Sequence, residues 1–159
     1  MLVNDLNKFN LFVDLDLLEL KKLLQFSSVK RFAADSVIFE KGRIQAGLIL
    51  VLNGRMELYD SIGDAKEHLN IDILYPGDFE GENTLFGEAT PRRYNARAME
   101  KLDLLWINTL DFRRLQNSAA AILAKLELRL IIELSNDFRK KNGEFGALRK
   151  ELESLEAKP

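Results

Sequence analysis

The chain carries at residues 76–86 the sequence PGDFEGENTLF, followed at residues 90–98 by TPRRYNARA. We expect a short helical turn directly after Gly81. Backbone amides at the start of a helix attract anions, and a glycine there lets a ligand approach the main chain closely. Glu82 is placed to accept hydrogen bonds from sugar hydroxyls, and Arg92 to hold a phosphate through a forked contact. Together these residue types predict a pocket for a sugar-phosphate ligand.

The two segments resemble the phosphate-binding cassette of the cyclic-nucleotide-binding domains of the catabolite activator protein and of protein kinase regulatory subunits. That cassette has a Gly-Glu pair, a short apolar helix, an arginine and a strand of small residues, and its matches here are Gly81-Glu82, Arg92 and Ala98. The resemblance covers roughly residues 9 to 140 and extends to Phe39-Glu40-Lys41-Gly42, the strand ending in Asn53-Gly54, Pro76-Gly77-Asp78, Leu105-Trp106-Ile107 and Asp111-Phe112-Arg113-Arg114-Leu115.

The resemblance implies a mostly β fold with flanking α-helices. The expected architecture is a small double-stranded β-helix barrel of the jelly-roll type, with N-terminal helices and a long C-terminal helix. The resemblance also implies that the chain is a sensor rather than an enzyme. Its ligand would be cyclic AMP, cyclic GMP or a similar small anion, and no further cofactor is expected.

Some cassette positions depart from the family pattern. Glu80 replaces an apolar residue, Asn83-Thr84 replaces an apolar-small pair, and Arg93-Tyr94-Asn95 replaces a run of small residues. If this last segment is a strand, its side chains alternate between two faces, so Arg92 and Tyr94 share one side and Arg93 faces the other. A register shift of one residue would instead make Arg93 the phosphate ligand.

The predicted binding residues are Gly81, Glu82, Asn83, Thr84, Arg92 and Arg93. A ligand-free alternative is a salt bridge between Glu82 and Arg92 in a fold that serves only for interaction. In the family the long helix touches the base. By position Asn136 or Asp137 is placed to do so here, unless both simply belong to the polar face of that helix.

Composition excludes several classes of site. The chain has 159 residues, a net charge of −2, no cysteine and a single histidine, His68. Disulfides and thiolate metal sites are impossible without cysteine, and one histidine excludes multi-histidine metal sites. The charge balance lacks the basic footprint of a nucleic-acid binder. Because neither a signal peptide nor an apolar run of about 18 residues is visible, we expect a cytoplasmic protein without a membrane span.

Local patterns predict helices at both ends of the chain and strands between them. Up to about residue 30 the apolar spacing is helical, and Asp14 or Asp16 is placed to cap a second short helix. Strands are expected at residues 37–39, 48–52, 55–59, 68–75, 94–98 and 104–107. We expect a two-residue hairpin turn at Asn53-Gly54, where both residues need positive φ, and a looser hairpin tip at residues 61–64.

The C-terminal region is predicted to be a long helix ending near Lys141, because cations favour a helix C-terminus and Gly143 follows. Its apolar residues lie on two faces, which requires two partners. We expect its own β domain to cover one face and a second copy of the chain to cover the other. The spacing of Phe145, Leu148, Leu152 and Leu155 indicates a short coiled-coil seam that would extend this homodimer.

The predicted organisation is a β domain with N-terminal helices at residues 1–118 and a helical segment for dimerisation or signal relay at residues 119–159. The tail beyond Lys141 is too short for a helix-turn-helix module, so no direct DNA binding is expected. Two alternatives to a cyclic-nucleotide sensor stay open. The first is a degenerate interaction module of the same fold, and the second is the sensor domain of a transcription regulator without its DNA-binding domain.

Overall fold

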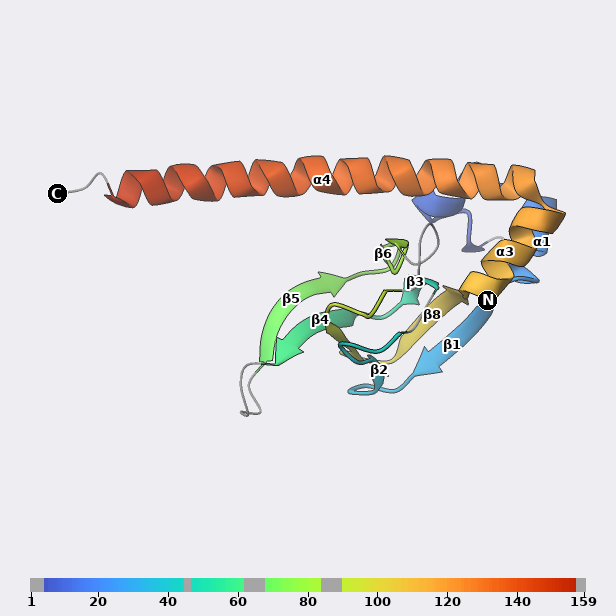
Figure 1. The fold of residues 1–159 in the computed structure, drawn as a ribbon, viewed down its shortest axis with the longest axis horizontal. Helices are drawn as coiled ribbons and strands as arrows, with labels where there is room; N and C mark the ends of the chain where they lie inside the picture. Colours follow the sequence, from blue (N-terminus) through green and yellow to red (C-terminus); the bar gives the residue numbers. More distant parts are fainter. Residues whose placement is uncertain (1–4, 45–46, 62–67, 84–89, 157–159) are drawn as a thin grey trace.

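The computed structural model describes residues 5–44, 47–61, 68–83 and 90–156, whose strands form two four-stranded antiparallel sheets (Figure 1). The first sheet has the order β1-β8-β3-β6, with bounds Ser28–Phe32, Leu102–Ile107, Leu48–Asn53 and Phe79–Glu80. The second has the order β2-β7-β4-β5, with bounds Val37–Phe39, Asn95–Ala98, Met56–Ser61 and His68–Leu74. The predicted β fold is confirmed, although the described strands form two separate sheets and no closed barrel.

Strands β3 and β8 are buried on both faces. Leu48, Leu50 and Leu105 lie in a core shared with the helices. Their sequence neighbours Ile49 and Trp106 lie in a second core, between the two sheets. Successive side chains of a strand point to opposite faces, so each of these strands contributes to both cores. Trp106 is therefore part of the core between the sheets.

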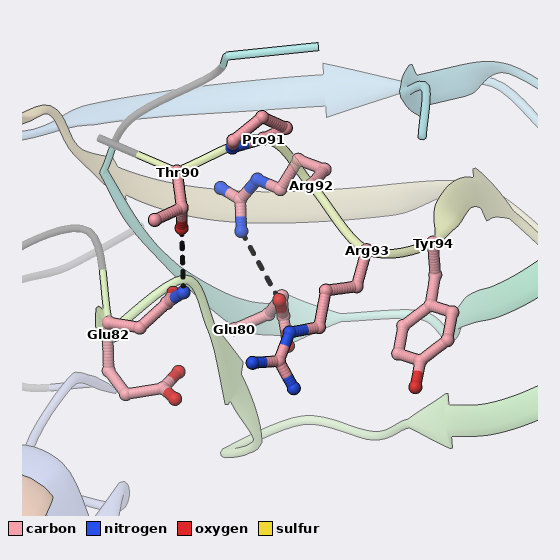
Figure 2. Close-up of a pocket in the computed structure, with 8 residues that line it drawn as sticks. Glu80, Glu82, Thr90, Pro91, Arg92, Arg93 and Tyr94 are labelled. Atoms are coloured by element: carbon pink, nitrogen blue, oxygen red, sulfur yellow. Dashed lines mark hydrogen bonds and ion pairs between the residues drawn. The ribbon is translucent and has the colours of Figure 1, made fainter. Parts of the chain in front are cut away.

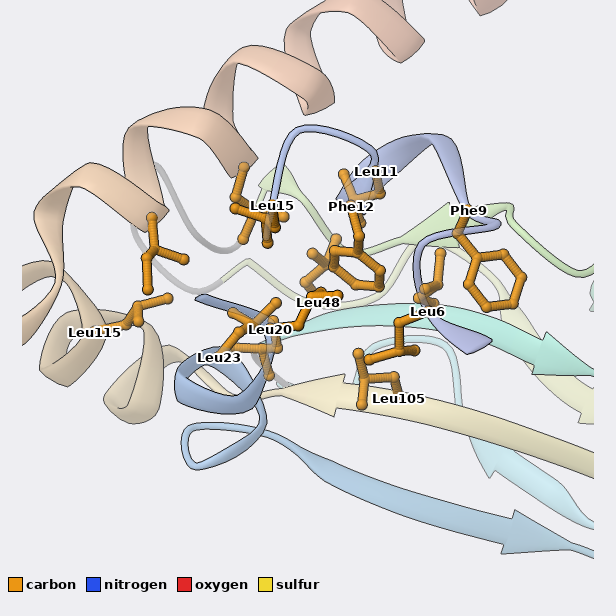
Figure 3. Close-up of a cluster of buried hydrophobic side chains, with 14 of the residues drawn as sticks. Leu6, Phe9, Leu11, Phe12, Leu15, Leu20, Leu23, Leu48, Leu105 and Leu115 are labelled. Atoms are coloured by element: carbon orange, nitrogen blue, oxygen red, sulfur yellow. The ribbon is translucent and has the colours of Figure 1, made fainter. Parts of the chain in front are cut away.

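The helices cover the outer face of the first sheet. Their bounds are Asn10–Phe12 for the 3-10 helix η2, Leu17–Leu24 for α1, Thr109–Ser118 for α3 and Ala120–Glu156 for α4. Asp16 caps α1 as predicted: its carboxylate accepts from the backbone N–H groups of Leu18 and Glu19, and the Glu19 carboxylate accepts from the backbone N–H of Asp16. Figure 3 shows the N-terminal side chains converging on Leu48 and Leu105.

The long helix α4 is predicted correctly at its start but not at its end. It runs through Gly143 to Glu156 and extends beyond the sheets (Figure 1). Gly143 lies in the helix rather than in a left-handed cap, and a glycine inside a helix costs only about 1 kcal/mol relative to alanine. Helix-forming residues follow it, and an ion pair between Arg149 and Glu153 supports the last turns. Among the described helices none has the length and apolar character to cross a membrane.

The Asn53-Gly54 turn connects the two sheets and does not form the expected hairpin. β3 pairs with β8 and β6, whereas β4, which follows the turn, pairs with β5 and β7. Of the two turn residues, Gly54 has positive φ, at +82°, and Asn53 does not. A two-residue hairpin signal reports local backbone preference, and here burial of β3 on both faces decides its partners instead.

Two other local predictions have different outcomes. β4 and β5 pair as a hairpin from Met56 opposite Leu74 to Ser61 opposite His68, while most of the predicted tip lies outside the described residues. The expected helical region up to residue 30 is wrong at its end, because β1 begins at Ser28. β1 is a largely exposed edge strand, so it lacks the apolar alternation that marks a half-buried strand.

We predict that Gly54→Ala destabilises the protein by roughly 3 kcal/mol, since a left-handed backbone strains alanine and its Cβ would clash with the Lys101 carbonyl oxygen. Gly42→Ala is the matched control: Gly42 has φ +81°, but nothing lies within 4 Å of its Cβ position. It should cost only about 1 kcal/mol. Urea unfolding of both variants measures the difference. Equal losses would show that the Lys101 contact contributes nothing.

Candidate functional site

The two segments that resemble a binding cassette meet at one edge of the sheets. β6 reaches this edge by pairing with β3, which places Glu80 opposite Ile49. On the other side, the Arg92 backbone is fixed to the turn at residues 42–43: the Gly42 N–H donates to the Arg92 carbonyl (2.9 Å), and the Arg92 N–H donates to the Arg43 carbonyl (3.0 Å). Both walls of the site therefore rest on paired main chain.

The Arg92 side chain is buried between these walls. Only 3% of it is exposed. Its Nη1 donates to Glu80 Oε1 at 3.3 Å, and its Nη2 donates to the Gly47 carbonyl at 3.2 Å (Figure 2 shows the Glu80 contact). The guanidinium also lies over the Phe39 ring, 4.4 Å from its centroid. Its Nε is buried and has no hydrogen-bond partner among the described residues.

Gly81 leaves the space that the Arg92 guanidinium occupies. A Cβ at Gly81, where φ is +90°, would lie 2.6 Å from Nη1 and 2.8 Å from Nη2 of Arg92, and would also meet the Gly47 carbonyl oxygen. A ligand was expected to approach the main chain at this glycine. In the structure it is filled by the protein's own arginine.

Burial dominates the electrostatics of the Glu80–Arg92 pair. It raises the pKa of the Glu80 carboxyl, to which the like charge of Glu82 adds, while Arg92 and Arg93 act in the opposite direction. Burial also lowers the pKa of the Arg92 guanidinium, against the effect of Glu80. The pKa of Glu80 is therefore higher in the folded state than in the unfolded state. Its contribution to stability is fully present at acid pH and is lost as the pH rises through the folded pKa.

A pocket of about 260 Å³ opens beside this pair. Four of the predicted residues line it, namely Glu82, Asn83, Arg92 and Arg93. Gly81 contacts Arg92 instead of lining the pocket, and Thr84 lies outside the described residues. The Asn83 amide donates to Thr90 Oγ1 at 3.2 Å and so joins the two cassette segments.

The sequence reasoning missed part of this site. Thr90 and Pro91 line the pocket, and Glu80, noted only as a departure from the family pattern, is the ion-pair partner of Arg92. The Gly47 carbonyl carries no sequence signal, because every residue has a backbone carbonyl. Glu80 could have been identified from its charge at a position where the family is apolar.

The predicted alternation of Arg92, Arg93 and Tyr94 is wrong. All three line the same pocket. β7 begins only at Asn95, and residues 93 and 94 form a bend, so the two-residue period of a strand does not apply to them. Arg93 therefore faces the site without any register shift.

A second cavity of about 290 Å³ adjoins the first and shares Glu80, Glu82 and Tyr94 with it. Its lining mixes charged side chains with apolar ones, and the apolar ones are Leu58, Ile71, Leu74, Phe79 and Leu134. Helix α4 closes it through Leu134, Asp137 and Lys141, and Lys141 donates to Asp72 of β5 at 2.9 Å. Of the two α4 residues proposed to reach a base, Asp137 lines this cavity and Asn136 does not.

No group of acidic or histidine side chains within the described ranges is arranged to hold a metal ion. The polar groups of the site are two arginines, two glutamates and the Asn83–Thr90 pair. Such groups bind an anion and hydroxyl groups by charge and hydrogen bonding.

Comparisons with known proteins identify the family and the fold of the chain. A family model described as cyclic nucleotide-binding domain matches residues 29–119. The HTH-type transcriptional regulator Cmr of Mycobacterium tuberculosis is 30% identical over 104 residues, which are 65% of this chain and 41% of that protein. The chain therefore spans less than half the length of this regulator.

Two solved structures share the fold. The Thermus thermophilus catabolite activator protein is 24% identical, with a TM-score of 0.70 over 88% of this chain and 63% of that one. A cyclic nucleotide-binding domain from Methylobacillus flagellatus is 21% identical, with a TM-score of 0.75 over 89% of this chain and 79% of that one. At these identities the likeness shows the fold alone.

We predict that Arg92→Gln lowers stability by roughly 2–3 kcal/mol, because it removes the contacts to Glu80, Gly47 and Phe39 and leaves a half-buried carboxylate unpaired. Arg93→Gln removes the same charge from an exposed neighbour and should change stability by less than about 0.5 kcal/mol. Chemical denaturation of both variants tests the contrast. Equal stabilities would contradict a structural role for the Arg92 guanidinium.

Proposed function

Because the chain belongs to the cyclic nucleotide-binding domain family, we propose that it is a cytoplasmic sensor rather than an enzyme. In this proposal it binds cyclic AMP, cyclic GMP or a related sugar phosphate. Occupancy of the site is then relayed through helix α4.

The observation that carries the proposal is the two-part cleft. One part contains both arginines, and the adjoining part adds the apolar side chains of Leu58, Ile71, Leu74, Phe79 and Leu134 and lies against α4. Each cavity alone is smaller than the roughly 300 Å³ at which small-molecule sites usually begin, whereas the two together enter that range. A nucleotide has the same division, with a charged phosphate at one end and a flat base at the other.

The residues suggest a role for each part of such a ligand. The phosphate lies at the arginine end, close to the Asn83 amide. Glu82 lines both cavities and accepts hydrogen bonds from the ribose between them. The base lies between Tyr94 and Leu134, where Asp137 accepts a hydrogen bond from an exocyclic amine. Gly81 shapes the pocket by admitting Arg92, and Thr84 stays a candidate contact.

Relay through α4 follows from the position of the second cavity. Three of its lining residues, Leu134, Asp137 and Lys141, belong to α4. A ligand in that cavity contacts the helix directly, so its affinity differs between positions of the helix. Such a differential affinity is the physical requirement for a two-state switch.

The exposed face of α4 supports a homodimer. Its large apolar side chains are exposed to solvent at Ile131, Leu134, Phe138, Phe145, Leu148, Leu152 and Leu155. With Lys141 included, their spacing alternates between three and four residues, which is the heptad pattern of a coiled coil. We call this row of residues the α4 seam. A second copy of the chain presents the same row and can cover it by symmetry.

Two alternatives have specific support. Glu80 pairs with the charge of Arg92 inside the protein, so that this arginine needs no anionic ligand. This pairing favours an interaction module that binds no nucleotide. The similarity to a transcription regulator of which the chain spans 41% favours the sensor part of such a protein.

Calorimetry with cyclic AMP and cyclic GMP tests the sensor proposal. We expect saturable binding of at least one of them, weakened roughly tenfold by Glu82→Gln, because a charged acceptor for a ribose hydroxyl is lost. Glu100→Gln is the control, since Glu100 pairs with Arg55 outside both cavities. If neither nucleotide gives heat or thermal stabilisation at millimolar concentration, the sensor proposal is wrong.

The homodimer is tested by light scattering on Leu148→Glu, which should be monomeric where the unchanged protein is dimeric, because a charge would be buried in the α4 seam. Ala147→Glu introduces the same charge at an exposed position off the seam and should stay dimeric. A monomeric unchanged protein, or a dimer that survives Leu148→Glu, would contradict the role of the seam.

A further inference from the structure

The two neighbouring arginines of the pocket are in different physical states. Arg92 is almost completely buried, and both of its terminal nitrogens already donate, one to Glu80 and one to Gly47. Its remaining nitrogen, Nε, is also buried, so a ligand in the pocket cannot reach it without moving protein atoms. With 3% of its side chain exposed, Arg92 offers a phosphate little accessible surface in this conformation.

Arg92 also supports the backbone around it. Its guanidinium lies over Phe39, fills the space beside Gly81 and binds the Gly47 carbonyl. Together with Glu80 on β6, these contacts join segments that are far apart in the sequence. Through these contacts the Arg92 side chain determines the shape of the site.

Arg93 is exposed and lines the pocket. Its side chain runs past Glu80 toward Glu82 (Figure 2). Within residues 5–44, 47–61, 68–83 and 90–156 no ion pair or hydrogen bond of its guanidinium is found. Its five N–H donors are therefore accessible for a planar, forked contact with an anion.

The charges of the pocket also distinguish Arg92 from Arg93. Glu80 pairs with Arg92 at 3.3 Å and interacts with Arg93 only through their charges, so Arg93 is the exposed arginine of the pocket, and Glu82 is a second carboxylate in its lining. From this geometry we infer that Arg93 makes the direct contact with the ligand's phosphate, and that Arg92 is a positioning residue. This inference rests on the proposed function, and it reverses the roles that the family pattern implies for the two positions.

Binding of cyclic AMP to four variants tests the assignment, with the thermal midpoint of unfolding measured for each. Arg93→Gln should weaken binding roughly tenfold, the usual effect of losing a charge-assisted contact, while leaving the thermal midpoint unchanged. Its affinity should also depend less on salt, because one cation no longer faces the phosphate. Arg93→Lys keeps the charge without the fork and should bind with intermediate affinity.

Arg113→Gln and Arg92→Gln complete the comparison. Arg113 is exposed on α3 and lines neither cavity, so its loss changes the net charge alone and should leave the affinity unchanged. Arg92→Gln should lower the thermal midpoint, and any loss of affinity should accompany that loss of stability.

Three outcomes would overturn the assignment. If Arg93→Gln binds as tightly as the unchanged protein, Arg93 is not the contact and the sensor proposal still stands. If Arg92→Gln abolishes binding with an unchanged thermal midpoint, Arg92 is the contact. If the unchanged protein binds neither cyclic AMP nor cyclic GMP, the proposed function fails and the assignment fails with it.

Discussion

The burial of β3 and β8 on both faces is the constraint on which the rest of the structure depends. Two antiparallel strands with apolar side chains on each face need a layer on either side. The N-terminal helices and the start of α4 provide one layer, and the second sheet provides the other. β6 pairs with β3 at the edge of this arrangement, which places Glu80 where the two sheets and α4 approach one another.

At that edge the site is organised around one buried guanidinium. Arg92 is held by groups from three separated segments, namely Phe39, Gly47 and Glu80. Burying a charge is unfavourable unless it is paired. Removing one partner of a buried ion pair strongly destabilises the fold, because it leaves the other charge buried without a partner. The identities of Gly81 and Glu80 are therefore coupled to Arg92: the glycine makes room for the guanidinium, and the glutamate balances its charge.

Sequence patterns predicted what depends on local preference. The apolar run at residues 48–52 indicated a strand, and Asp14 or Asp16 was placed to cap a short helix, which Asp16 does. The cassette residues Glu82, Asn83, Arg92 and Arg93 were found because a family pattern gives their spacing. Predictions failed at the turn after β3, where tertiary structure overrides local preference, and at the end of α4, where helix-forming residues carry the helix past Gly143. Nothing local could show that Arg92 is neutralised inside its own pocket, because Glu80 and Gly47 meet it only in the folded chain.

The two halves of α4 are attached to the body with very different strength, and this gradient makes a relay physically reasonable. Leu123, Leu126 and Leu130 lie fully in the core, and Lys125 pairs with Glu19 at 2.7 Å. Beyond them, the ion pair that joins described residues of α4 to the sheets is Lys141–Asp72, and a pair of that exposed kind contributes about 0–1 kcal/mol. A ligand that binds only one position of the helix, present at about 100 times its dissociation constant, stabilises that position by about 2.7 kcal/mol. Binding beside Leu134 and Asp137 would therefore outweigh the existing attachment, and the position of the α4 seam would depend on occupancy of the cleft.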